Sequence, residues 1–76
     1  MADNGLGAME ARFADIIWES EPVSSTELVR RAEQELGWKK STTYTVLKRL
    51  AARGLFSNEN GTVRALVSRR DYYAER

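Results

Sequence analysis

The chain has 76 residues, of which 42% are hydrophobic and 30% charged, so it forms one small globular domain at most and is not a disordered tail. It lacks cysteine and histidine, which excludes disulfides and thiolate or imidazole metal sites. It also lacks an apolar stretch of membrane-spanning length and a signal peptide, so we expect a cytoplasmic protein without a membrane partner. The net charge of +1 combines −5 over residues 1–36 with +6 over residues 37–76, which indicates an anionic partner for the second half, unless the basic face is merely solvated.

The first helix is expected within residues 6–20, after a loose leader at residues 1–5. Gly7 is its predicted N-cap, and Pro22 ends the segment in a turn. Apolar residues recur there at helical spacing. The predicted buried stripe consists of Met9, Phe13, Ile16 and Ile17.

A capping box opens the second predicted helix. Ser24 is the expected cap, and Glu27 is expected to reach back to it. Gly37 ends this helix, because glycine readily adopts the left-handed conformation found after a helix. Trp38, which follows, is expected to pack into the core. The predicted buried stripe consists of Leu28, Val29, Ala32 and Leu36.

The third predicted helix spans about residues 40–53 and ends at Gly54. Its inward face consists of Val46, Leu47 and Leu50, with Thr43 at the upper end. Its outward face carries hydroxyls, one phenol and cations, and residues 40–53 contain no acid to neutralise them. Threonine is a weak helix former, so helix propensity is sacrificed here for another property. The expected outward stripe is Thr42, Thr45 and Arg49, flanked by Ser41, Tyr44 and Lys48.

The pattern then changes from helical to alternating. Asn60-Gly61 predicts a tight hairpin, because both central positions of a type I′ turn need positive φ. Ser68 is the expected cap of a fourth helix in residues 69–76, where Tyr72 and Tyr73 have little to pack on. That helix looks cut short, so we expect these residues to begin a linker to a region beyond the chain.

Three helices followed by a hairpin predict a mainly α fold with a small β-hairpin. The expected architecture is a winged helix-turn-helix over residues 6–68, with a three-helix core, a wing and the start of a fourth helix. In that arrangement the third helix enters the major groove of double-stranded DNA. Basic side chains neutralise phosphates, and short hydroxyl side chains contact base edges. The predicted DNA-binding residues are Lys40, Ser41, Thr42, Tyr44, Thr45, Lys48, Arg49 and Arg64.

Two other functions compete with DNA binding. A winged helix can serve as a protein–protein interaction module, in which case an aromatic patch of Trp38, Tyr72 and Tyr73 would matter more than the basic helix. An enzyme is the weaker alternative, because no nucleophile–base pair can be assigned without histidine or cysteine. We therefore predict no catalytic residue, no cofactor and no metal site.

The ordered motifs "FADIIWE", "EPVSSTELV" and "GWKKSTTYTVLKRLAARGL" resemble the N-terminal domain of the BlaI/MecI/CopY penicillinase-repressor family, and the match extends over residues 6–73. In that family a tryptophan ends the first helix, and a second precedes a Thr-x-x-Thr-x-Leu-x-Arg-Leu motif and a glycine. The matching positions are Trp18, Trp38, Thr42, Thr45, Leu47, Arg49, Leu50 and Gly54.

The resemblance implies a transcriptional repressor that binds a palindromic operator, with TACA/TGTA half-sites, as a homodimer. It assigns major-groove contacts to Thr42 and Thr45 and a phosphate or base contact to Arg49. It also implies a C-terminal dimerisation region, which is absent from this chain. The chain departs from the family pattern in the wing, where Thr62 follows the turn glycine in place of an arginine and Arg64 comes later, and in Lys39, which replaces the usual serine cap.

Overall fold

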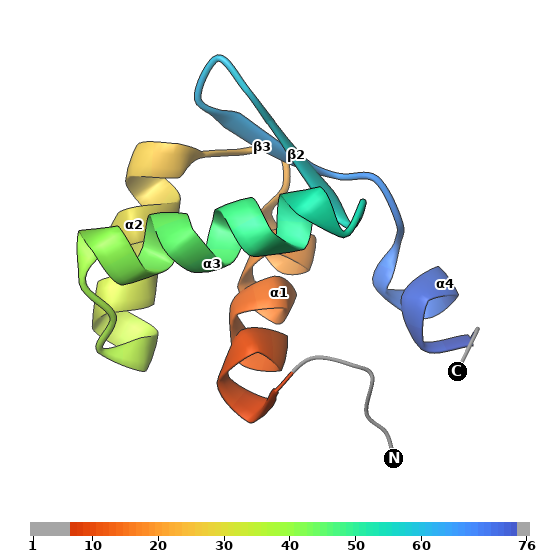
Figure 1. Cartoon of the computed structure of the whole chain (residues 1–76), viewed down its shortest axis with the longest axis horizontal. Coiled ribbons are helices and arrows are strands. Elements are labelled where there is room, and N and C mark those ends of the chain that lie inside the picture. The colour runs from red at the N-terminus through yellow and green to blue at the C-terminus, as the bar shows by residue number, and fades with distance from the viewer. Residues whose placement is uncertain (1–6, 75–76) are drawn as a thin grey trace.

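The computed structural model describes residues 7–74, so the expected leader at residues 1–5 and the last two residues of the predicted linker lie outside the described residues. These residues form four helices and three short strands (Figure 1). The elements are α1 (Ala8–Ser20), β1 (Val23–Ser24), α2 (Ser25–Leu36), α3 (Lys40–Ala52), β2 (Phe56–Glu59), β3 (Thr62–Ala65) and α4 (Arg69–Ala74).

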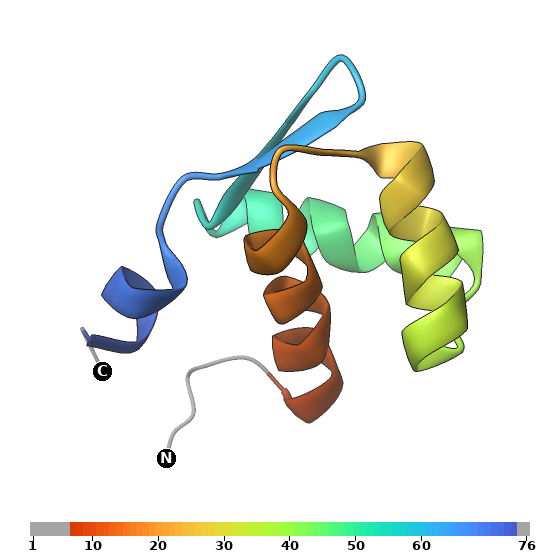
Figure 2. The same ribbon diagram turned by 180° about the vertical axis from the view of Figure 1, so that it is seen from behind.

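The first three helices surround a single hydrophobic core that the sheet closes at one end. The two opposite views agree that α2 and α4 lie on opposite sides of α1, with the hairpin projecting beyond the helices (Figures 1 and 2). The largest fully buried side chains are Phe13, Phe56, Ile17, Leu28, Leu50, Val63 and Thr43. Met9, which was expected in the buried stripe, is 41% exposed, because the core begins one helical turn later, at Phe13.

The predicted hairpin is confirmed. Strands β2 and β3 pair antiparallel, with Phe56 opposite Ala65 and Glu59 opposite Thr62. The turn residues Asn60 and Gly61 have φ of 55° and 80°, the positive values that a tight hairpin turn requires.

The segment after Pro22, expected to be only a turn, contributes a third strand. Val23 pairs with Val63 and Ser24 with Thr62, so the sheet order is β1-β3-β2. The carboxylate of Glu21 accepts a hydrogen bond from the Ala65 backbone N–H at 2.8 Å. Two residues are too few to produce an alternating pattern, which explains why the strand was not predicted.

The capping contacts of α2 confirm the sequence prediction in part. Ser24 accepts a hydrogen bond from the Glu27 backbone N–H at 3.0 Å, and Gly37 ends the helix with φ of 72°. The expected return contact from the Glu27 side chain is wrong, because its carboxylate pairs with Arg30 one turn later. The hydrogen bond from Arg30 holds the pKa of Glu27 below its ordinary value.

The fourth helix begins as predicted, since Ser68 accepts a hydrogen bond from the Asp71 backbone N–H at 3.0 Å. The expectation that its tyrosines have little to pack on is wrong. The ring of Trp18 lies 5.9 Å from that of Tyr72 and 6.1 Å from that of Tyr73, measured between centroids. The Trp18 indole also donates a 2.8 Å hydrogen bond to the carbonyl of Val67, which ties α1 to the segment before α4.

The core position of α3 can be tested by truncating one leucine in it. Leu50 is fully buried, so Leu50→Ala should lower the free energy of unfolding by about 2–5 kcal/mol, through lost burial and the cavity left behind. Urea denaturation followed by circular dichroism measures this change. Leu66→Ala is the matched control, because Leu66 is 60% exposed and its truncation should change stability by no more than about 0.5 kcal/mol. Equal losses in the two variants would contradict the assigned core.

Candidate nucleic-acid interface

Helix α3 is held by a strip of four buried side chains. Thr43, Val46, Leu47 and Leu50 all face the core, as the sequence predicted. The Thr43 hydroxyl donates to the carbonyl of Lys39 at 3.1 Å, so this buried polar side chain is satisfied within the helix. Gly54, with φ of 83°, follows the helix end. These contacts determine which side of α3 faces the solvent.

The solvent-facing side of α3 follows from helical geometry. At roughly 100° per residue, Ser41, Thr45 and Lys48 run along its middle, opposite the buried strip. Thr42 and Arg49 lie along one edge of this exposed side. All five of these side chains are exposed, as is Lys40 at the start of the helix. The structure therefore brings five of the eight predicted contact residues together on one side of α3, with Lys40 exposed at its start.

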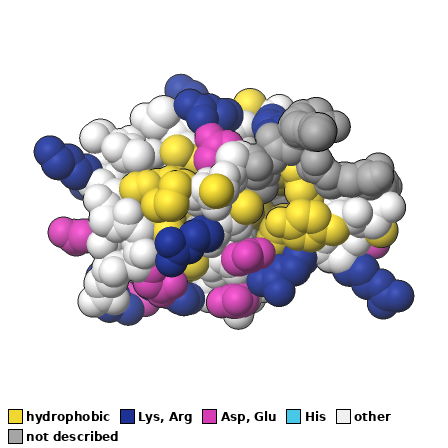
Figure 3. Space-filling model, turned by 90° about the horizontal axis from the view of Figure 1, so that it is seen from below, with side chains coloured by type: hydrophobic (Ala, Val, Ile, Leu, Met, Phe, Trp, Pro, Cys, Tyr) yellow, Lys and Arg dark blue, Asp and Glu magenta, His cyan; other side chains and the backbone are white. Residues whose placement is uncertain are grey.

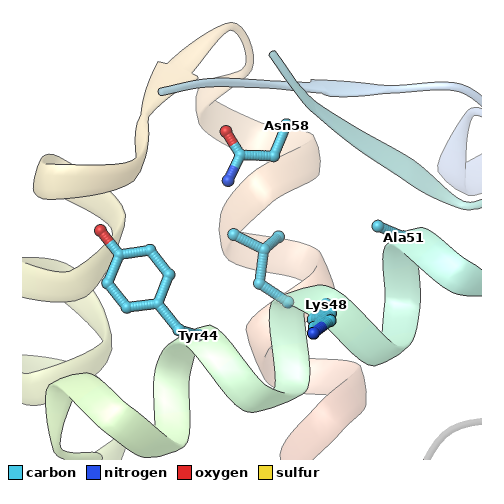
Figure 4. A pocket seen from close by; sticks show the side chains of 5 residues that line it. Tyr44, Lys48, Ala51 and Asn58 are labelled. Carbon is cyan, nitrogen blue, oxygen red and sulfur yellow. The ribbon is translucent and has the colours of Figure 1, made fainter. Parts of the chain in front are cut away.

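Tyr44 occupies the opposite edge of this surface and is half-buried rather than fully outward. Its phenol oxygen lies 3.4 Å from the hydroxyl of Ser25, at the start of α2. Figure 4 shows its ring leaning from α3 toward α2. Tyr44 thus joins the two helices of the helix-turn-helix and still borders the exposed side of α3.

A hollow of about 300 Å³ separates α3 from the hairpin. Asn58, from β2, projects into this space above α3 (Figure 4). The lining residues are Tyr44, Leu47, Lys48, Ala51 and Asn58. Sequence reasoning missed Asn58, because its place across from α3 depends on how the hairpin folds back. The one available signal was its alternation with Ser57 in the predicted strand.

Arg64, the predicted DNA contact on the hairpin, is exposed on β3. It lies on the opposite face of the hairpin from Asn58. Directly paired residues of an antiparallel sheet project from the same face. Asn58 is paired with the buried Val63, whereas Arg64 is paired with Ser57. Arg64 therefore lies on the outer face of the hairpin, away from the hollow, and the structure does not bring it onto the α3 surface.

The expectation that no acid neutralises the cations on the outward face of α3 is wrong for Arg49. Glu10, in the first turn of α1, forms an ion pair with Arg49. The sequence could not show this contact, because the two residues are 39 positions apart and meet only where the helices pack. Within residues 7–74, the side chains of Lys40 and Lys48 form no hydrogen bond or ion pair.

The face of the molecule seen from below is mixed in character. Seen from below in Figure 3, basic and acidic side chains alternate around hydrophobic patches. Arg69 of α4 is one such case, since it contacts Asp15 at 3.1 Å and Glu19 at 3.5 Å. The aromatic residues also divide into two groups, because Trp38 packs against Phe13 whereas the α4 tyrosines pack against the other tryptophan.

Two further features of the described residues concern membranes and metals. Over residues 7–74, every helix is too short or too polar to cross a bilayer. Among the same residues, no three acidic side chains gather in a way that could hold a metal ion.

The three-helix core, the exposed face of α3 and the adjoining hairpin define a winged helix-turn-helix protein. Residues 6–76 match the sequence profile described as "Penicillinase repressor", and the chain belongs to that family. It is a family of DNA-binding transcriptional repressors rather than of enzymes. Comparisons with curated proteins and with solved structures found no match.

The assignment of Thr43 to the buried side of α3, and of Thr42 and Thr45 to its exposed side, can be tested without DNA. Thr43→Val removes one buried hydroxyl while retaining the shape of the side chain, so it should cost about 0.5–1.5 kcal/mol of unfolding free energy. Thr42→Ala and Thr45→Ala, on the exposed side, should stay within about 0.5 kcal/mol of the parent. Urea denaturation of the three variants measures the difference. A larger loss for either exposed threonine would show that the sides of α3 are wrongly assigned.

Proposed function

We propose that this chain is the DNA-binding domain of a repressor and that α3 enters the major groove of a palindromic operator. The observation that carries the proposal is the exposed middle of α3, where two hydroxyls and a lysine stand in line at Ser41, Thr45 and Lys48. Short hydroxyl side chains allow the helix to approach the base edges closely, and the threonine methyl suits contact with a thymine methyl.

The proposed contacts fall into two kinds. Thr42 and Thr45 read base edges, together with Ser41 at the start of the helix. Basic side chains on and beside α3 meet the phosphates, which supply affinity without sequence preference. The proposed phosphate contacts are Lys40, Lys48 and Arg49, with Tyr44 and Asn58 beside the DNA strand that passes the hollow.

We further propose that residues 6–68 form the DNA-binding domain and that residues 69–76 begin a link to a dimerisation region. A single winged helix buries too little surface for tight specific binding. Two copies held about one helical turn apart would match the two halves of a palindrome. A homodimer through a C-terminal region is therefore part of the proposal, and the chain alone should bind DNA modestly.

The phosphate contacts are tested by the salt dependence of binding. Lys48→Ala should weaken binding to every duplex and reduce the slope of log K against log salt by about 0.9, the value for one phosphate. Fluorescence anisotropy with a labelled duplex at several salt concentrations measures the slope. Arg70→Ala is the matched control, because it removes one exposed cation from α4 rather than α3. Wild-type binding without any salt dependence would refute the proposed function, and equal slopes for the two variants would remove Lys48 from the interface.

The base contacts are tested by sequence preference. A selection of bound sequences from random duplexes, performed with a dimeric form, first identifies the preferred site. Thr45→Ala should then lower discrimination between that site and its substituted versions by about 1–3 kcal/mol at one base pair. Thr26→Ala, an exposed threonine of α2, should leave the pattern of preference unchanged. If Thr45→Ala retained the full preference, direct readout by this side chain would be excluded.

A further inference from the structure

The ion pair between Glu10 and Arg49 links α1 to the edge of the proposed DNA-binding surface. Arg49 remains 56% exposed by its side chain, whereas Glu10 is only 22% exposed. The carboxylate is therefore largely covered by the fold, and the guanidinium is the partner that faces the solvent. The pair lies where α1 passes beside α3, so the two charges meet as a consequence of the helix packing.

The geometry leaves Arg49 able to bind a second group. Its Nη1 donates to Oε2 of Glu10, whereas a guanidinium carries five N–H donors in a rigid plane. A DNA phosphate approaching α3 would meet a cation whose charge is already balanced by a carboxylate. It would also meet the carboxylate itself, which repels it. Both effects weaken binding to the backbone, which is the same for every base sequence.

Resting on the proposed function, we propose that Glu10 limits the affinity of the α3 surface for the DNA backbone. By balancing Arg49, its carboxylate suppresses the sequence-independent part of DNA binding and leaves the base contacts of the threonines untouched. Affinity for the operator and for unrelated DNA is therefore lower with Glu10 than without it, and both fall less steeply with salt.

The test uses Glu10→Gln, which keeps the shape and the hydrogen-bond acceptor but removes the charge. The variant should bind an unrelated duplex up to about eightfold more tightly near 0.1 M salt, with a slope steeper by up to about 0.9, because Arg49 then meets its phosphate with a charge that no carboxylate balances. Affinity for the selected operator should rise by a similar factor, because the phosphate contact is independent of base sequence. Fluorescence anisotropy of both duplexes over a salt series measures each quantity, and circular dichroism verifies that the variant is folded.

Asp15→Asn is the matched control. Asp15 lies on the same helix and also pairs with an arginine, but that arginine is Arg69 of α4. Its replacement removes the same charge from α1, and it should leave the affinity for unrelated DNA within about twofold of wild type, because the cation that it frees belongs to α4 and salt screens exposed charges. An equal gain from Asp15→Asn would mean that the total charge of the protein, not the pair, controls binding, and would overturn the proposal.

A double-mutant cycle isolates the pair. In an Arg49→Ala background, Glu10→Gln should lose most of its effect on the salt slope, because the cation that it releases is gone. An unchanged or weaker affinity of Glu10→Gln for unrelated DNA, or an identical gain with and without Arg49, would refute the inference. If either of these results occurred while wild type bound DNA with the expected salt dependence, only the proposed role of Glu10 would be refuted. Absence of salt-dependent binding by wild type would overturn the proposed function and this inference together.

Discussion

Burial of one face of α3 is the constraint on which the rest of the molecule depends. Thr43, Val46, Leu47 and Leu50 are packed into the core, and a helix is stiff, so none of its other side chains can turn independently. Once this strip is buried, the hydroxyls and the central lysine must face the solvent together. The chemistry of the exposed surface is thus set by hydrophobic packing on the other side of the same helix.

The hairpin is attached to this helix through the sheet. Val63 is completely buried and pairs with both Val23 and Asn58, so a single residue connects the core, the strand before α2 and the wall of the hollow. The backbone N–H of Ser25 also donates to the carbonyl of Gly61 at 2.8 Å, which ties the start of α2 to the tip of the hairpin. The start of α2, the wing and α3 are therefore held as one unit, which suits a surface that must match a rigid duplex.

Charge is distributed differently along the chain and in space. The acidic first half and the basic second half would suggest two separate faces. Folding instead brings acids of α1 to basic residues that come later, as in the contact of Glu10 with Arg49 and of Asp15 with Arg69. Cations without such a partner therefore carry the positive potential of the α3 surface. Affinity for a polyanion is then set by a few positions rather than by the net charge.

The sequence alone determined the helices, the ends of α2 and the hairpin, because these depend on neighbours within a few positions. Ser24 marks the start of α2 and Gly37 its end, and Asn60-Gly61 forms the turn of the hairpin. It also determined which side of α3 is buried, since a helix repeats every 3.6 residues. Contacts between distant segments leave no periodic signal. Tertiary structure alone therefore decided the pairing of β1, the place of Asn58 across from α3 and the meeting of Glu10 with Arg49, which all require segments far apart in sequence to pack together.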